Sequence, residues 1–332
     1  MIMENKLYTK SEVINFINQG KVMLLSGSEK AISGLPNGKW IAGTTPYFMD
    51  GVGVQDEEKI FVDDFTDYAQ NVKIKMLDSN NIQTIATEAF GNGFVVIVLP
   101  IESDVYYTFS ANSLNFDGIF DNPVVGYVSC CNINMISNPK TFVASGLDGK
   151  VVNDKAAVLY VELPDSMTAR TEIMNFDTID ETTPVVVFPK TSFVQSDCLI
   201  DGKPGNISDY LENVVKPKIG GYTQFITSMN GALINRDPKV VNTETGETSF
   251  YSPVYKDDKY QLVKPGKDYA KAFNDNLNAK TAPVVAAFSC ISYFFGGNFI
   301  GKHISKNGVY AFGEIAYQLL NKTIVTLEIE KA

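Results

Sequence analysis

The sequence predicts an α/β protein, in the broad sense that includes α+β. Two related units are expected to pack their mixed β-sheets together, flanked by helices, in a sandwich-like arrangement. Strand and helix patterns alternate along the amino-terminal half, and a strand, turn, strand pattern recurs in both halves. The 332 residues are 45% apolar and 20% charged, a composition typical of folded globular proteins. A chain of this length is expected to form about two domains.

The first predicted helix begins after Thr9, whose hydroxyl can cap it, and Glu12 completes a capping box three residues later. Gly20 ends this helix, and a strand is expected over residues 21–25. The next elements are predicted as strands over residues 39–45, 60–65, 72–77 and 94–99, and as helices over residues 80–90 and 103–114. This order favours an α/β fold over an all-β fold.

The second half opens after the apolar run at residues 185–189, where polar turns containing glycine begin to recur. We therefore expect two domains, residues 1–189 and residues 190–332. In the second domain a helix over residues 268–277 precedes a long apolar strand that starts near Val284. Residues 281–301 carry no charge, but serines, glycines and Pro283 interrupt them, which favours a buried strand and a glycine turn over a membrane span.

Charge and composition exclude several functions. The net charge is −10 and no basic stripe is present, so neither nucleic acid nor an anionic membrane is an expected partner. The four cysteines and the single histidine, His303, fit neither a disulfide framework nor a nitrogen and sulfur metal site. The amino terminus lacks the apolar core of a secretory peptide, so a cytoplasmic protein with free thiols is expected.

The recurring pattern places a glycine-containing apolar strand before an Asn or Asp, a Lys and a second apolar strand. The three copies occupy residues 40–45 with 56–62, residues 124–129 with 153–161, and residues 308–314 with 321–327. One interpretation is that related units arose from one ancestral hairpin. The other is that turns simply favour Asn and Asp.

The third copy, Gly308–Ile315 followed by Leu320–Thr323, resembles the carboxy-terminal signature of the FIST family of sensory domains. Further segments that resemble the family are residues 43–45, 125–126, 198–210, 260–270 and 288–290. The first predicted domain is similar to the amino-terminal FIST domain and the second to the carboxy-terminal one. Members usually follow the strand cysteine with arginine and glycine, whereas here Ile291 follows Cys290.

The resemblance implies a sensory, ligand-binding module of signal transduction. Its ligand would be a small molecule such as an amino acid, it would need no established cofactor, and its output would pass to a signalling partner protein or a homo-oligomer. The loss of the arginine implies a ligand that is less acidic or differently held. No reaction is securely implied, so the chain is more readily a binding module than an enzyme.

We expect the ligand in a crevice between the two units, near the carboxyl ends of strands. The candidate ligand-binding residues are Thr44, Thr45, Tyr127, Cys130, Cys290, Tyr310 and Glu314. Glu314 lies in an apolar segment, where its carboxylate would pair with a cationic group of the ligand unless a strand end exposes it. Tyr310 would cover an apolar part.

Two other functions stay open. A thiol-dependent enzyme would use Cys290 as nucleophile and His303 as base, although buried free cysteines are commonly inert and surface histidines are frequent. Cys130 and Cys131 are neighbours in a strand-like segment, so one could face the core and the other the crevice. A scaffold that contacts another protein is the third alternative.

Overall fold

The computed structural model describes residues 4–219, 223–229, 231–264, 268–280, 282–304 and 306–332, and it confirms the α/β class with mixed sheets and flanking helices. It contains two compact units. Unit 1 comprises Met1–Ile173, Asp268–Leu319 and Ile324–Ala332, and unit 2 comprises Met174–Lys267 and Leu320–Thr323. The expected division near residue 190 is therefore not the one observed, because unit 2 is inserted into the chain of unit 1.

Unit 1 is built from one order of elements that occurs three times. The first repeat contains β1 (Lys6–Tyr8), α1 (Lys10–Asn18), β2 (Met23–Gly27), α2 (Glu29–Ile32), β3 (Trp40–Thr44), β4 (Tyr47–Asp50), β5 (Val52–Gln55) and β6 (Ile60–Asp64). The second contains β7 (Asn71–Leu77), η1 (Ile82–Thr84), β8 (Gly93–Leu99), α3 (Asp104–Asn112), η2 (Ser113–Asn115), β9 (Val124–Val128), η3 (Ile133–Met135), β10 (Val143–Ser145), β11 (Val151–Val152) and β12 (Ala156–Glu162). The third contains β13 (Met167–Met174), α6 (Tyr269–Ala279), β24 (Val284–Cys290), α7 (Ile291–Gly296), β25 (Gly308–Ala311), β26 (Gly313–Ala316), β27 (Gln318–Leu320) and β28 (Ile324–Lys331).

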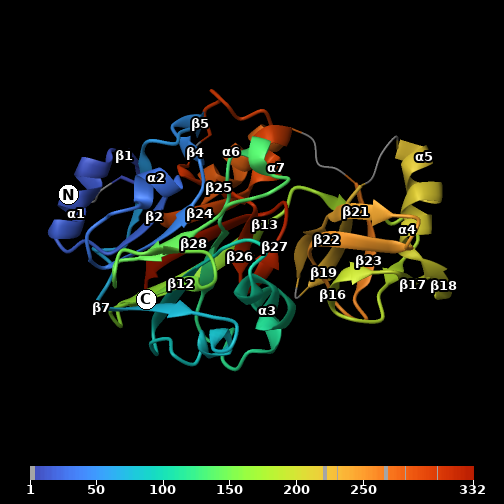
Figure 1. The fold of residues 1–332 in the computed structure, drawn as a ribbon, viewed down its shortest axis with the longest axis horizontal. Helices are drawn as coiled ribbons and strands as arrows, with labels where there is room; N and C mark the ends of the chain where they lie inside the picture. Colours follow the sequence, from blue (N-terminus) through green and yellow to red (C-terminus); the bar gives the residue numbers. More distant parts are fainter. Residues whose placement is uncertain (1–3, 220–222, 230, 265–267, 281, 305) are drawn as a thin grey trace. The chain divides into compact units, whose positions relative to one another are not determined.

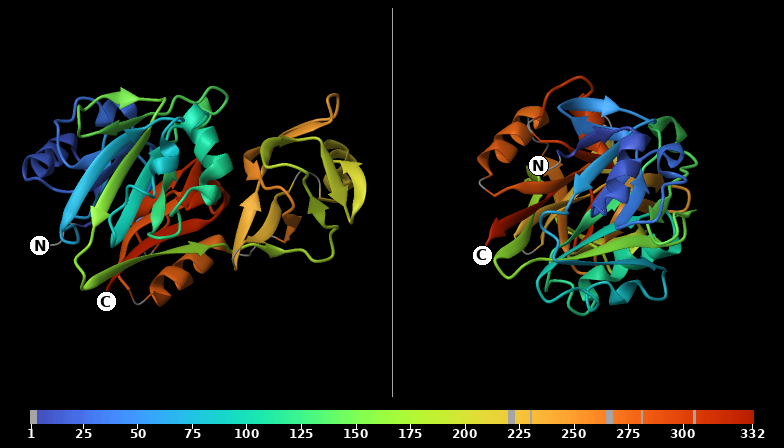
Figure 2. Two further views of the ribbon diagram at one scale, coloured as in Figure 1. Left: turned by 90° about the horizontal axis from the view of Figure 1, so that it is seen from below. Right: turned by 90° about the vertical axis from the view of Figure 1, so that its left-hand side faces the viewer.

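The three repeats exchange strands in a cycle. The sheets have the orders β1-β6-β2-β3-β10-β11, β7-β12-β8-β9-β26-β27 and β13-β28-β24-β25-β4-β5. Each sheet thus takes four strands from one repeat and two from another. The second repeat adds two strands to the sheet of the first repeat, the third adds two to the sheet of the second, and the first adds two to the sheet of the third. The colours of distant chain segments accordingly mix within unit 1 (Figures 1 and 2).

Each repeat also has one parallel strand pair, β2 with β3, β8 with β9, and β24 with β25. A helix connects the two strands of every pair. The three copies of the sequence pattern are β3 with β6, β9 with β12, and β25 with β28. These strands are not hairpin partners, because β2, β8 or β24 lies between them. All three copies belong to unit 1, apart from the turn before β28.

The capping box at Thr9 is confirmed, since its side chain accepts from the backbone of Glu12 and the Glu12 side chain bonds back to the Thr9 backbone. The predicted helix over residues 80–90 is wrong. Only the short turn η1 forms there, and the hydroxyls of Thr84 and Thr87 bond to the carbonyls of Asn81 and Thr84. Such local hydrogen bonds compete with helix formation.

Buried apolar residues of the first repeat, together with Ala144 of β10, form a core that includes residues of α1, α2 and the first sheet and the fully buried Trp40. The uncharged segment near residue 284 forms the buried strand β24, as predicted, followed by α7 before the glycine turn. None of the helices in the described ranges is long and apolar enough to cross a membrane. Thr281 and residues 265–267, which entered the sequence predictions, lie outside the described residues.

Unit 2 is mostly antiparallel β structure. Its elements are β14 (Thr178–Ile179), β15 (Val186–Val187), β16 (Ser192–Gln195), β17 (Asp197–Ile200), β18 (Lys203–Asn206), α4 (Ile207–Tyr210), the π-helical η4 (Leu211–Val215), α5 (Lys216–Ile219), β19 (Phe225–Met229), β20 (Ala232–Arg236), β21 (Pro238–Asn242), β22 (Glu247–Val254) and β23 (Lys259–Lys264). The rings of Phe188, Phe225, Phe250 and Tyr260 pack together in its core.

Candidate functional site

Three of the seven predicted ligand-binding residues meet at one pocket of unit 1, which we call the strand-end pocket. It has a volume of about 300 Å³ and lies where β2 and β3 end and where the chain leaves β9. Its lining residues are Ser28, Glu29, Lys30, Thr44, Thr45, Pro46, Glu57, Glu58, Cys130, Cys131, Asn132, Met135 and Lys140. Carboxyl ends of parallel strands are a common position for ligand crevices in α/β proteins.

The predicted residues Thr44, Thr45 and Cys130 form a buried floor. The backbone N–H of Cys130 donates to the carbonyl of Thr44 at 2.6 Å, which holds the end of β9 against the end of β3. The hydroxyl of Thr45 donates to the carbonyl of Tyr310 at 2.6 Å, and the Thr44 hydroxyl accepts from the backbone of Phe142 at 3.0 Å. These bonds satisfy the floor internally and make it rigid.

The rim of the strand-end pocket is charged. Lys30 and Glu58 pair with each other at 2.8 Å, and Glu57 accepts from the Asn132 side chain at 2.9 Å. Among the described residues, no hydrogen bond or ion pair engages the side chains of Lys140 or Glu29. The rim therefore carries one cation and one anion that no described residue pairs with.

The thiols of the pocket are not activated. Burial raises the pKa of Cys130 well above its usual value, with Cys131 adding to the shift and a hydrogen bond to Thr45 opposing it. Burial also raises the pKa of Cys131. All four cysteines are free and buried. A neutral thiol is a weak nucleophile, so Cys130 and Cys131 act as small, soft wall groups.

Tyr127 lies behind the pocket rather than in its lining. It is fully buried, its hydroxyl shares a 2.7 Å hydrogen bond with the hydroxyl of Ser26, and it donates to the carbonyl of Gly43 at 3.0 Å. Burial raises the pKa of this phenol, so it stays neutral. Tyr127 thus links β9 to β2 and β3 and supports the floor.

Cys290, Tyr310 and Glu314 are also buried outside the pocket lining. The Tyr310 ring packs on Phe294 with centroids 5.1 Å apart, and only its backbone carbonyl reaches the floor, through Thr45. Glu314 is fully buried within β26 opposite Tyr127 on β9, so exposure at a strand end does not apply to it. The expected set therefore divides into three pocket residues and four supporting core residues.

The structure does not bring the histidine to the thiol that the enzyme alternative requires. Cys290 is the last residue of β24 and pairs with Ala311 of β25. The residue before Ala311, Tyr310, pairs with Tyr47, the first residue of β4. Cys290 therefore lies level with the start of β4. His303 forms a bridge with Val52, which is paired with the last residue of β4. The two ends of β4 are about 10 Å apart. Nδ1 of His303 instead lies 2.6 Å from the carbonyl oxygen of Gly51.

Sequence reasoning missed the rim of the pocket. Lys140 and Met135 belong to the connection from β9 to β10, residues 129–142, whose counterparts are only residues 45–46 in the first repeat and residue 312 in the third. The long connection covers the strand ends. The available signal was the length of this polar segment between the two strands of the second copy. Glu29 follows Ser28, which caps α2, and carried no distinguishing pattern.

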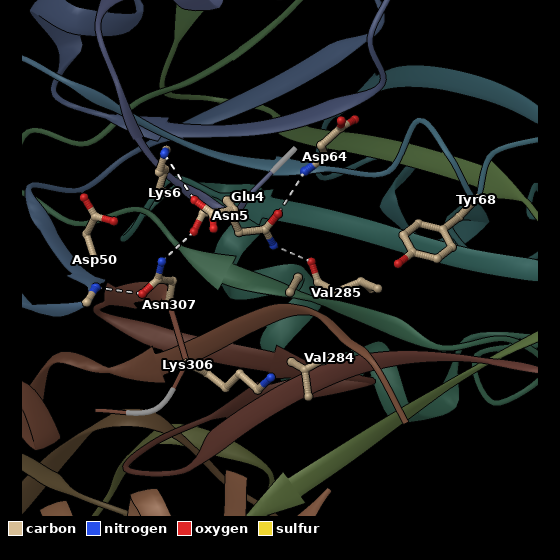
Figure 3. Close-up of a pocket in the computed structure, with 12 residues that line it drawn as sticks. Glu4, Asn5, Lys6, Asp50, Asp64, Tyr68, Val284, Val285, Lys306 and Asn307 are labelled. Carbon is tan, nitrogen blue, oxygen red and sulfur yellow. Dashed lines mark hydrogen bonds and ion pairs between the residues drawn. The ribbon is translucent and has the colours of Figure 1, made fainter. Parts of the chain in front are cut away.

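A second pocket, which we call the edge pocket, lies elsewhere in unit 1 and has a volume of about 450 Å³ (Figure 3). It is bounded by residues 4–6, the turn between β4 and β5, the chain after β6, the start of β24 and the residues before β25. No cluster of three or more His, Cys, Asp or Glu side chains suited to a metal ion occurs within the described part of the chain.

The fold and the strand-end pocket define a class of protein: a three-repeat α/β unit with a second unit inserted in its last repeat and a pocket at its parallel strand ends. The chain belongs to the family described as a family of unknown function (DUF6976), which it matches over residues 8–330. No curated protein matches the chain.

Proposed function

We propose that the protein is a small-molecule-binding module of signal transduction, and that the strand-end pocket holds an amino acid or a closely related polar metabolite. The observation that carries the proposal is the convergence of Thr44, Thr45 and Cys130 on one pocket at the ends of parallel strands. The volume of about 300 Å³ is at the lower end of the range of small-ligand pockets.

The charges of the rim favour a zwitterion. Lys140 offers an ammonium group for a carboxylate, and Glu29 offers a carboxylate for an ammonium group, because neither is used by the described protein residues. Pro46, Met135 and the neutral thiol of Cys130 provide a soft apolar wall for a side chain. A free amino acid carries all three complementary parts.

A sensory role and a cytoplasmic location are part of this proposal. The FIST resemblance supports the role, and the free, buried thiols fit a reducing compartment. A bound ligand would stabilise the state of the protein that holds it. A partner protein or a homo-oligomer would then respond to that state and carry the signal.

A thermal-shift screen of the twenty amino acids tests the proposal. A ligand that binds only the folded protein raises its melting temperature, by a free energy of about 2.7 kcal/mol at one hundred times its dissociation constant. We expect at least one amino acid with an apolar side chain to do so. Lys140→Ala and Glu29→Gln should each weaken its binding about tenfold, since each removes one charge-assisted contact.

Lys39→Ala provides the matched control, because Lys39 is an exposed lysine of unit 1 outside the pocket. The dissociation constant of the amino acid for this variant should equal that for the unmodified protein. The proposal is wrong if no amino acid or related metabolite shifts the melting temperature, or if Lys140→Ala and Lys39→Ala bind the ligand equally well.

A further inference from the structure

An apolar recess adjoins the edge pocket. The recess has a volume of about 380 Å³ and is lined by Tyr68, Met167, Ala282, Pro283, Ile329, Glu330 and Lys331. Tyr68 lines both cavities, and Pro283 of the recess is followed directly by Val284 of the edge pocket. The two cavities therefore adjoin.

Most charges at the polar end neutralise one another. Lys6 pairs with Glu4 at 3.2 Å, and Lys21 pairs with Asp64 at 3.1 Å. Lys306 differs, because none of the described residues forms a hydrogen bond or ion pair with its ammonium group. It is the cation of this pocket that remains available to a ligand.

Lys306 and Tyr68 lie on different sides of the pocket (Figure 3). Figure 3 shows the ammonium group of Lys306 directed toward Val284 and the hydroxyl of Tyr68 directed toward Val285. Burial raises the pKa of Tyr68, so its hydroxyl stays protonated and can donate a hydrogen bond. Asp50, the remaining lining carboxylate, lies at the end of the pocket away from Tyr68 (Figure 3). An anionic group is thus favoured beside Lys306.

The recess offers the opposite chemistry. Met167, Ala282, Pro283 and Ile329 supply aliphatic walls, and Tyr68 is shared with the edge pocket. Every methylene group that a ligand buries against such walls strengthens binding by about fourfold. The charge of Lys306 fixes one end of a ligand, and the recess selects an alkyl chain at the other.

We propose that the edge pocket and the apolar recess together bind a medium-chain carboxylate. Its carboxylate pairs with the Lys306 ammonium, and its alkyl chain extends past Val284 and Tyr68 to lie against Met167, Pro283 and Ile329. This site is separate from the strand-end pocket and does not depend on the function proposed for that pocket.

Isothermal titration of the full chain with sodium octanoate, sodium hexanoate and octylamine tests both ends of the site. We expect octanoate to bind about tenfold more tightly than hexanoate, because two further methylenes are buried. Octylamine has the same chain with the opposite charge and should bind at least tenfold more weakly than octanoate. No detectable octanoate binding at millimolar concentration, or equal affinity for octanoate and octylamine, would overturn the proposal.

Two variants locate the binding. Lys306→Gln should weaken octanoate binding about tenfold, and Met167→Asp should weaken it at least as much by placing a charge in the recess. Lys203→Gln, at an exposed lysine of unit 2, is the matched control and should change nothing. Emission of Trp40, the only tryptophan of the chain, verifies that each variant keeps unit 1 folded.

The same titrations separate the two pockets. Lys140→Ala should leave octanoate binding unchanged, and Lys306→Gln should leave unchanged any rise in melting temperature that an amino acid causes. If Lys140→Ala abolishes octanoate binding and Lys306→Gln does not, the carboxylate occupies the strand-end pocket and the proposed second site is wrong.

Discussion

Asp237, at the turn between β20 and β21 of unit 2, has an Oδ1 atom that is shielded from solvent and has no hydrogen-bond partner within the described residues. Burial raises its pKa to about 7; Lys322 and Arg236 oppose the shift and Asp177 adds to it. Nearby, Lys322 pairs with Asp177 at 3.1 Å. Asp237 is therefore an acid of unit 2 that holds its proton near neutral pH.

The first prediction concerns the pH dependence of stability. Because the folded pKa of about 7 exceeds the unfolded value of about 4, the folded state binds the proton more tightly. The contribution of Asp237 to the unfolding free energy is full below about pH 4 and is lost as the pH rises through 7. Asp237→Asn should thus gain about 1–2 kcal/mol relative to the unmodified protein between pH 5 and pH 8.

Urea unfolding followed by circular dichroism at pH 5 and pH 8 measures this difference. Asp197→Asn, at an exposed aspartate of the same unit, is the control and should show no such change. An equal response of the two variants to pH would contradict the assignment of the proton to Asp237.

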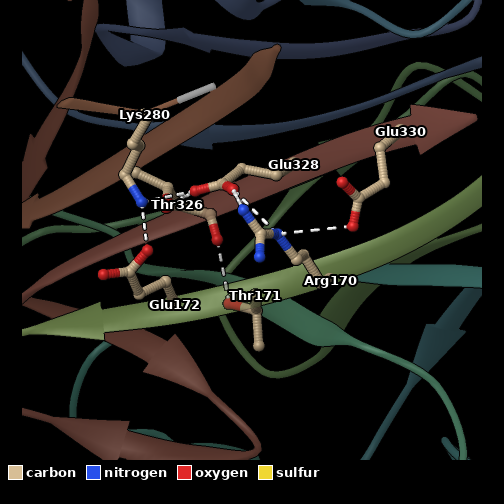
Figure 4. Close-up of polar contacts among 7 residues, drawn as sticks. All are labelled: Arg170, Thr171, Glu172, Lys280, Thr326, Glu328 and Glu330. Atoms are coloured by element: carbon tan, nitrogen blue, oxygen red, sulfur yellow. Dashed lines mark hydrogen bonds and ion pairs between the residues drawn. The ribbon is translucent and has the colours of Figure 1, made fainter. Parts of the chain in front are cut away.

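Three elements of unit 1, β13, β28 and the end of α6, meet at a charged cluster around Glu328 (Figure 4). Glu328 is fully buried, accepts from Arg170 at 2.7 Å and also pairs with Lys280, which in turn pairs with Glu172. Burial alone would raise the pKa of Glu328, but the hydrogen bonds and charges of Lys280 and Arg170 hold it below its usual value. The cluster fastens the strand that leads into unit 2 and the helix that returns from it.

The second prediction is that Glu328→Gln destabilises unit 1 by about 2 kcal/mol, because Lys280, which is 6% exposed, keeps only the half-exposed Glu172 as an ionic partner. Arg170→Ala should cost about 1 kcal/mol or less, because Arg170 is 51% exposed. Urea unfolding followed by Trp40 emission measures both values.

The effect of Glu328→Gln should also depend on pH. Since the folded pKa of Glu328 is lowered, its stabilising charge is present above about pH 4.5 and is lost as the pH falls through the folded value. A deficit in Glu328→Gln that stayed the same from pH 7 to pH 3 would indicate lost packing instead of lost charge.

At the scale of the whole molecule, unit 2 interrupts an otherwise regular repeat. In the first repeat a single residue, Thr9, separates β1 from α1, whereas in the third repeat unit 2 stands between β13 and α6. The corresponding helix of the third repeat begins after Asp268, which caps it by accepting from the backbone of Lys271. The three-repeat unit therefore contains its own cycle of sheets without unit 2.

The third prediction is that replacing residues 175–267 with a short glycine and serine linker leaves unit 1 folded. Trp40 is buried in unit 1, so its emission maximum should stay that of a buried indole and should change in one cooperative step on unfolding. Emission typical of exposed tryptophan in the shortened chain would show that unit 1 needs unit 2 to fold.

Local patterns were predictable where neighbours in sequence decide the structure. The capping box at Thr9, the strand from Val284 and the cap of α3 at Ser103 follow from short-range rules. The helix expected over residues 80–90 failed because threonine hydroxyls there bond to local carbonyls. Thr44 and Thr45 were identified as pocket residues because they follow a glycine-containing strand and precede a proline.

The sequence by itself determined the α/β class, the strands of the repeated pattern and its threefold recurrence, because apolar periodicity and caps act over a few residues. Only the tertiary structure decided that the copies exchange strands in a cycle, that unit 2 is an insertion, and that Cys130 meets Thr44 while Glu314 is buried in β26. These features depend on hydrogen bonds between strands that are far apart in the chain, and such pairing is set by packing of the whole unit.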